Sequence, residues 1–422
     1  MYQLAIIFLG VLLMACNEPK KTVTNSADYN KYLSQTEGND KLQFAKNELD
    51  FWTTKFDKAP NQSTFLTKMA GANNQLFEIT GQIEFLNSAD VQLAKATEMR
   101  SHKSASLERS LAKTRITQHR FLEAKQSLMI ADSLGEQKLT TQKMLFDVEM
   151  ELGNYKESEI LLSQIGAEED FDYLIRLAKW LDYKGNTSGA ISKLELALTK
   201  ADNENLKLWL YSNLGDFYGH VGNINQSYSH YLKALAIDPH YLYALKGIAW
   251  INFSHENNVE EAERIITFLE AKHAAPDYLL LRSEIAKFKG DLISEKSLKK
   301  EYISKVSQPA YGDMYNAYLV TLLENDPQKA LALAKKEVSN RPTPQSYQLL
   351  SWALCQNGNN AEALSIAEIQ VKGKTFEPKS LFHLAEVYKL NGKDEKVKEL
   401  KLALEDSFYE VGPNVAHTII KL

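Results

Sequence analysis

One stretch, residues 208–240 (LWLYSNLGDFYGHVGNINQSYSHYLKALAIDPH), constrains the fold of this chain more than any other. Its first half places Tyr211, Leu214, Gly215 and Tyr218 at the i, i+3, i+4, i+7 spacing of one helical face. Because glycine costs a helix roughly 1 kcal/mol relative to alanine, we expect Gly215 to make room for the close approach of another backbone. The pattern predicts an amphipathic helix that packs tightly against a neighbour.

The second half of the stretch predicts a turn, a second helix and a stop. Gly222-Asn223 is turn chemistry that tolerates positive φ. A second apolar stripe follows, and Asp238-Pro239 ends it, because the residue before a proline is pushed out of the α region. Large and small residues on the two faces would let the helices nest against each other. The stretch therefore predicts one antiparallel helical hairpin.

The same order of residues recurs from about residue 105 to about residue 405, with prolines between the units. It resembles the tetratricopeptide repeat (TPR), W-x2-L-G-x2-Y followed by A, F, A and P over 34 residues. Leu214-Gly215 and Tyr218 match this pattern, and Tyr211 stands where the family has tryptophan. The resemblance implies an all-α fold, a right-handed α-solenoid of about 8–10 helical hairpins in which each unit packs on its neighbours.

The first residues, MYQLAIIFLGVLLMAC, predict export. Residues 2–15 are uncharged and apolar, too short for a mature membrane span and suited to a signal-peptide core. The run ends Leu13-Met14-Ala15-Cys16, which resembles the bacterial lipobox, so Cys16 is the expected site of lipidation. Two or more acyl chains there would anchor the chain stably to a membrane. The alternative is an ordinary secretory signal followed by a chance cysteine.

These signals divide the chain into five segments. Residues 1–15 are the expected signal peptide, and the polar residues 16–41 are the expected flexible tether. Residues 42–104 are expected to form N-terminal helices and a degenerate repeat, with a long connection through Gly81 and Phe85 before a helix over 89–99. The alternative is that this pair is an N-terminal capping hairpin. Residues 105–405 are the expected repeat array, and residues 406–422 break the pattern as a C-terminal cap or tail.

Charge and cysteine content narrow the function classes. A formal net charge of −5 with 24% charged residues argues against phosphate-driven binding of nucleic acid. No stretch after residue 15 is long and apolar enough to predict a transmembrane helix. Cys355 is the only cysteine besides Cys16, and its place in the apolar run LLSWALCQ predicts a small buried hydrophobe.

No sequence motif indicates catalysis, a metal or a cofactor. His255-Glu256 begins like the zinc-protease motif H-E-x-x-H, but Val259 stands where the second histidine must be. The sequence has no G-x-S-x-G, no G-x-x-x-x-G-K-[ST] and no Cys/His cluster with metal spacing. We therefore expect a protein that is not an enzyme and that binds no cofactor and no metal.

In the resembled family, fixed places on the first helix of each unit line a concave groove that grips extended peptides or partner helices. Carried onto this sequence, the resemblance implies a partner-binding groove formed by Lys179, Tyr183, Trp209, Asp216, His220, Tyr243, Lys246, Trp250 and Phe253. Large aromatic residues are favoured anchors at interfaces. The alternative is that superhelix packing or a terminal cap covers these residues.

Together these features favour a non-enzymatic lipoprotein scaffold of a bacterial cell envelope. Lipid on Cys16 would tie it to the membrane, and an envelope protein or peptide would bind along the concave face. Asn17 is not the aspartate that retains some lipoproteins at the inner membrane, so the outer membrane is favoured. The alternative is a surface glycan- or nutrient-binding lipoprotein, since one large bacterial family pairs lipidation with such repeats. An enzyme whose site is assembled from separate repeats is a third hypothesis.

Overall fold

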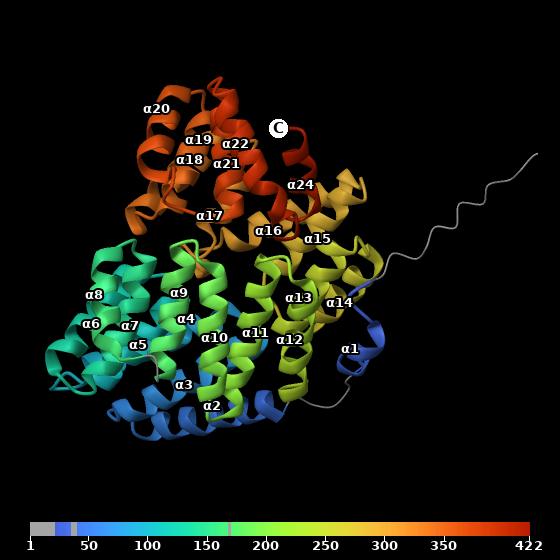
Figure 1. Cartoon of the computed structure of the whole chain (residues 1–422). Helices are drawn as coiled ribbons and strands as arrows, with labels where there is room; N and C mark the ends of the chain where they lie inside the picture. The colour runs from blue at the N-terminus through green and yellow to red at the C-terminus, as the bar shows by residue number, and fades with distance from the viewer. Residues whose placement is uncertain (1–21, 35–39, 168–169) are drawn as a thin grey trace, which may run out of the picture.

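The computed structural model describes residues 22–34, 40–167 and 170–422 (Figure 1). Within these ranges the regular elements are all helical, and no strand occurs. None of the helices described there is long and apolar enough to cross a membrane. The expected signal peptide and Cys16 lie outside the described residues.

Ten helical hairpins make up most of the described chain, which confirms the expected all-α solenoid of about 8–10 units. They follow α2 (Asp40–Lys58). The hairpins are α3 (Ser63–Thr80) with α4 (Ile83–Glu98), α5 (Ala105–Thr117) with α6 (Phe121–Leu134), α7 (Lys138–Glu151) with α8 (Tyr155–Ile165), α9 (Phe171–Tyr183) with α10 (Thr187–Lys200), α11 (Glu204–His220) with α12 (Ile224–Ile237), α13 (Leu242–Trp250) and the π-helical turn η1 (Ile251–His255) with α14 (Val259–Lys272), α15 (Asp277–Phe288) with α16 (Leu292–Val306), α17 (Asn316–Leu322) with α18 (Pro327–Asn340), α19 (Pro344–Gln356) with α20 (Asn360–Ile366) and η3 (Ala367–Val371), and α21 (Pro378–Leu390) with α22 (Asp394–Leu404).

The hairpin at residues 208–240 forms as its sequence predicts. Gly222 has φ +73°, and the Asn223 side chain accepts a hydrogen bond from the backbone N–H of Gln226 at the start of α12. The helix ends at Ile237, immediately before Asp238-Pro239. Local turn and stop chemistry therefore fixes both ends of α12.

Gly215 makes room for an aromatic ring, and the expectation of a backbone there is wrong. The Tyr231 ring from α12 lies between Gly215 on α11 and Gly247 on α13. A Cβ at Gly215 would lie 2.5 Å from the ring, and a Cβ at Gly247 would lie 2.4 Å from it. Two glycines on neighbouring units thus form a slot for one tyrosine, which is 3% exposed.

A one-residue insertion, which the sequence places in the turn at Asn257-Asn258, is absorbed inside the preceding helix. Residues Ile251–His255 form a π-helical turn, η1, which takes up one extra residue without breaking the helix. Asn257 then adopts φ +57° in the turn itself. The unit keeps its register with its neighbours because the helix carries the extra residue.

The expected long connection through Gly81 and Phe85 is wrong. Gly81 has φ +66° and closes α3, and α4 already begins at Ile83. Leu86 and Ala89 are fully buried, so the apolar face of α4 begins well before residue 89. The first hairpin is therefore a full unit with a tight turn.

The expected flexible tether over residues 16–41 is wrong for residues 22–34, here called the strap. It contains α1 (Ser26–Leu33), and Tyr29 is fully buried in the largest core cluster, beside α12 and α14. The backbone N–H groups of Val23 and Thr24 both donate to Glu256 Oε1 at 2.7 Å. The Tyr29 hydroxyl donates to Glu261 at 2.7 Å. The strap is thus part of the folded body.

The later turn of the superhelix stacks on the earlier turn. In Figure 1 the last hairpins (orange to red) lie against earlier hairpins (teal to green). Arg341 pairs with Glu151 at 3.3 Å, across 190 residues of sequence. Connections between hairpins of the second half contact hairpin turns or adjoining helix ends of the first half: Ala274 meets Thr80, Ala310 meets Asn87, Pro342 meets Gly153 and Phe376 meets Gly185. Tyr409, which follows the last hairpin, meets Gly219 at the end of α11. One turn of the superhelix therefore takes about 190 residues.

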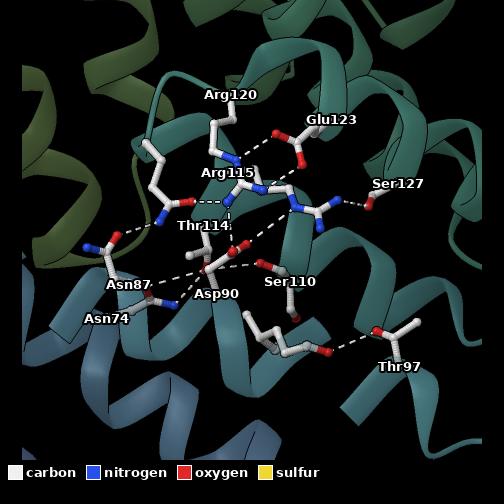
Figure 2. Close-up of polar contacts among 12 residues, drawn as sticks. Asn74, Asn87, Asp90, Thr97, Ser110, Thr114, Arg115, Arg120, Glu123 and Ser127 are labelled. Carbon is white, nitrogen blue, oxygen red and sulfur yellow. Dashed lines mark hydrogen bonds and ion pairs between the residues drawn. The ribbon is translucent and has the colours of Figure 1, made fainter. Parts of the chain in front are cut away.

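A polar network inside the first two hairpins supports this closure (Figure 2). Asp90 on α4 accepts from Arg115 at 3.3 Å and from Arg120 at 2.7 Å, so one carboxylate joins two guanidinium groups. Gln118 donates to Asn87, and Asn87 in turn donates to the carbonyl of Ala310 at 2.9 Å. The network links α4 to α5 and α6, and links α4 to the second half of the chain.

The last residues fold back over the middle of the solenoid. The 3₁₀ turn η4 (Glu405–Ser407), α23 (Phe408–Val411) and α24 (Pro413–Ile420) follow the tenth hairpin. Phe408, Val411 and Ile419 share a core cluster with Phe382 and Leu404 of that hairpin. Residues 409–414 reach further, to α11, η1 and α15.

Candidate functional site

Lys179 and Tyr183, both predicted groove residues on α9, bridge adjacent units. Lys179 Nζ lies 3.0 Å from Glu151 Oε1. Burial alone would raise the pKa of Glu151, but Lys179 and Arg341 together hold it below its ordinary value. The Tyr183 ring stacks on Tyr155, with centroids 3.9 Å apart and an interplanar angle of 20°. Both side chains thus have partners within the fold.

Asp216 and Tyr243 also contact each other. Asp216 accepts hydrogen bonds from the hydroxyls of Tyr231 at 2.6 Å and Tyr243 at 2.7 Å. Burial raises the pKa of Asp216, although both tyrosine hydrogen bonds oppose the rise. The carboxylate therefore holds the two tyrosines in place, and the Tyr243 ring remains 48% exposed.

Tyr409 and Glu410, near the C-terminus, contact Trp250 and His220. His220 Nδ1 lies 2.9 Å from Glu410 Oε2, and Trp250 Nε1 donates to the carbonyl of Tyr409 at 3.1 Å. Phe253 is only 1% exposed and packs edge-to-face against Trp250 and Phe288. Phe253 lies in η1 and belongs to the largest core cluster, so it does not line a groove.

The ion pair between His220 and Glu410 predicts a pH-dependent stability. Burial lowers the pKa of His220, but the hydrogen bond and charge of Glu410, with the charges of Asp216 and Glu377, outweigh it and raise the pKa to about 9. A raised histidine pKa stabilises the fold fully below about pH 6.5, and this stability is lost as pH rises through about 9. Because the His220 side chain is 42% exposed, we expect only about 1 kcal/mol.

Thermal unfolding of the wild type and of His220→Gln, followed from pH 6 to pH 10, measures this contribution. The wild type should be more stable than the variant at the acidic end. The two curves should converge at the alkaline end, where the imidazole is neutral. A constant gap across the range would show that the ion pair contributes nothing and that the substitution acts through packing.

One part of the concave face remains open. A cavity of about 1190 Å³, here called the open cavity, is lined by Tyr243 and Lys246 and by residues of α2, α3, α14 and α15. Lys246 Nζ lies 4.0 Å from Asp277 Oδ1, and the lysine side chain is 40% exposed. Trp209 on α11 is 41% exposed but does not line the cavity. Two of the predicted groove residues, Tyr243 and Lys246, therefore line an accessible cavity.

The sequence did not predict the opposite wall of the open cavity. Lys41 and Phe44 of α2 lie there, and Lys41 pairs with Asp238 at 2.6 Å. His240, Lys272 and His273 complete the set of basic residues from the connections and α14. The repeat pattern assigns no groove role to α2, because α2 precedes the first hairpin and reaches the cavity only through the curvature of the solenoid.

A second cavity, of about 1040 Å³, lies where the two halves of the chain meet. Tyr155, Trp180 and Tyr183 form one side, and Pro342 and Tyr347 form the other. Lys184 Nζ lies 4.8 Å from the Trp180 ring centroid and so covers part of the aromatic surface. Tyr183 is the predicted groove residue that lines this cavity.

The described residues hold no group of three or more His, Cys, Asp or Glu side chains that could bind a metal ion. Cys355 is buried in α19, and burial raises the pKa of its thiol to about 11. A thiol in this state is a poor nucleophile, because the thiolate is the reactive form. Cys355 therefore packs as a small apolar side chain.

Comparison with known proteins found no matching family model and no curated protein similar in sequence. Solved structures with a related arrangement of helices include three with low identity. YrrB, a TPR protein with an unusual peptide-binding site, is 19% identical, covers 46% of this chain and 95% of its own, and has a TM-score of 0.28. Yeast Tom70 is 14% identical, covers 90% and 99%, and has a TM-score of 0.34. The human IFIT1 dimer with PPP-AAAA is 14% identical, covers 90% and 93%, and has a TM-score of 0.45.

Identities below 20% and TM-scores below 0.5 carry no functional conclusion for this chain. The fold follows from the ten hairpins, their glycine turns and their buried small and large residues. These hairpins make the chain an all-α, TPR-like solenoid.

Proposed function

We propose that this chain is a non-enzymatic, membrane-anchored scaffold of a bacterial cell envelope that holds an envelope protein or peptide in the open cavity. The observation that carries the proposal is the cavity itself, about 1190 Å³ and lined by Tyr243, which is 48% exposed. Pockets for small ligands usually measure about 300–1,000 Å³, so this hollow is large enough for a peptide segment. Accessible aromatic rings are frequent anchors for protein partners.

The open cavity offers a partner aromatic side chains and charges of both signs. Lys41, Lys246 and Lys272 line it together with Asp40, Glu78, Asp238 and Asp277. Asp216 fixes the Tyr243 hydroxyl and thereby holds the exposed ring in one position, which lowers the entropy lost on binding. An apolar side chain against Tyr243 and a carboxylate near Lys246 would satisfy both features.

The membrane anchor in this proposal rests on the lipobox-like residues Leu13-Met14-Ala15-Cys16, which lie outside the described residues. Asn17 favours the outer membrane as the destination. Metabolic labelling with a palmitate analogue should mark the wild type, and Cys16→Ser should abolish the label. Labelling that survives this substitution would exclude Cys16 as the lipid site.

Crosslinked pull-down of the full chain from envelopes tests the proposed binding. The wild type should recover one defined envelope protein, and Lys246→Glu should lower the recovery about tenfold, because it places a like charge opposite an acidic partner. Lys335→Glu, at an exposed position of α18 that does not line the cavity, is the matched control and should bind normally. Recovery of lipid alone, or equal loss in both variants, would defeat the proposal. Binding on a polysaccharide array instead would favour the glycan-binding alternative.

A further inference from the structure

Residues 409–414, here called the C-terminal segment, lie on the concave face as a bound peptide would. The carbonyl of Tyr409 accepts hydrogen bonds from Trp250 Nε1 at 3.1 Å and from Ser254 Oγ at 2.6 Å. Side chains of one element that bind the backbone of another are typical of peptide recognition. Trp250 is one of the residues that the sequence assigned to the groove.

The concave face also contacts the side chains of the segment in order. The Tyr409 ring covers Gly219, where a Cβ would lie 2.7 Å from it. Glu410 pairs with His220 at 2.9 Å. Asn414 Nδ2 donates to the backbone carbonyl and to the carboxylate of Glu284, both at 2.8 Å.

Gly412 completes the pattern. It has φ +82°, and a Cβ there would lie 2.9 Å from the Trp250 ring. Both the backbone conformation and the close approach favour glycine at this position. The contacts together define the order Tyr-acid-x-Gly-x-Asn.

We propose that the C-terminal segment occupies, within its own chain, a peptide-binding surface of Gly219, His220, Trp250, Ser254 and Glu284, and that the external partner of this surface is a protein segment with the order Tyr-acid-x-Gly-x-Asn. This inference rests on the proposed role as a peptide-binding scaffold. None of these five residues lines the open cavity, so the two sites can be tested with different variants.

The C-terminal segment can leave this surface, and an external peptide can take its place. α23 has four residues, too few to be a stable helix by itself. Phe408 and Val411 pack on the tenth hairpin, and they keep the segment near the surface when its other contacts break. Such tethering gives an effective concentration on the order of millimolar, so an external peptide binds weakly to the wild type and more tightly once the contacts within the chain are weakened.

Fluorescence anisotropy with a labelled synthetic peptide, DSFYEVGPNVA (residues 406–416), tests the proposal on the full chain. Tyr409→Ala with Glu410→Ala weakens the internal contacts but leaves Phe408 and Val411 on the last hairpin. We expect this double variant to bind the peptide at least tenfold more tightly than the wild type. Adding His220→Ala to the double variant should weaken its binding of the peptide several-fold. In that triple variant, replacing the glutamate of the peptide with alanine should weaken binding no further.

A double variant that stays folded and binds the peptide no better than the wild type overturns the inference. Gly412→Ala is a second way to loosen the segment, since its Cβ would meet Trp250. If both variants unfold, the test is the hydrogen-exchange rate of residues 408–412 in isotope-labelled wild type. Excess unlabelled peptide should raise this rate. An unchanged rate overturns the inference. If the peptide does not bind but a partner is captured in a Lys246-dependent way, this inference is wrong and the proposed function stands. If the peptide binds but no partner is captured, the proposed function of the open cavity is wrong.

Discussion

Replacing Tyr231 with alanine is expected to lower the free energy of unfolding by about 3–5 kcal/mol, the range for removing a large buried aromatic side chain. The ring fills the slot between Gly215 and Gly247, and neither glycine has a side chain that could fill the space left behind. The substitution also removes one of the two hydroxyls that hold Asp216. Chemical denaturation followed by circular dichroism measures the loss, and hydrogen exchange should place it in α11–α14.

Tyr231→Phe is the matched control for this prediction. It keeps the ring and removes only the hydrogen bond to Asp216, which retains the Tyr243 hydroxyl. We expect a loss of about 1 kcal/mol. Equal losses for alanine and phenylalanine would mean that the hydrogen bond, and not the filled slot, holds the two units together.

Removing Asp90 is expected to cost about 3 kcal/mol, at the low end of the range for breaking a buried ion pair. Its carboxylate is 15% exposed and holds both Arg115 and Arg120 (Figure 2). After Asp90→Ala, Arg120 keeps Glu123, but Arg115 keeps only the hydroxyl of Ser127 within this network. Faster hydrogen exchange in α4–α6 together with an earlier denaturation transition would report the loss.

Glu395→Ala provides the contrast for Asp90→Ala. Glu395 pairs with Lys398 three residues on, and both side chains are largely exposed. An exposed pair of this kind contributes less than about 0.5 kcal/mol. If the two alanine variants lose similar amounts of stability, burial of the Asp90 network does not contribute as argued.

The hairpins were predictable because their signals are local. Gly222 and Asp238-Pro239 act within one or two turns of helix, so the limits of α12 follow from sequence. The slot for Tyr231 was not predictable, because Gly247 belongs to the next unit and matters only once α13 is packed. The sequence did not predict that the strap is folded, because its two buried tyrosines, Tyr29 and Tyr32, lie in a short polar segment and form no sustained apolar pattern.

Closure of the solenoid could not be predicted, because it depends on the angle between successive units. Small changes in that angle, summed over several hairpins, decide whether Arg341 meets Glu151. The repeat pattern does assign His220 and Trp250 to the concave face. It could not show that Glu410 and Tyr409 lie on them, because the C-terminal segment lies outside the repeats.

With acyl chains on Cys16, the docked strap would limit how far the folded body can stand from a bilayer. Seven residues of chain lead from Cys16 to Val23, whose backbone is held by Glu256. Fully extended, they span at most about 25 Å. With acyl chains on Cys16, the body would be kept upright beside the lipid headgroups, with its α12–α14 side nearest the membrane. A partner would then have to approach along the bilayer surface. The anchor would therefore restrict binding to proteins at the same membrane, whatever the side chains of the cavity recognise.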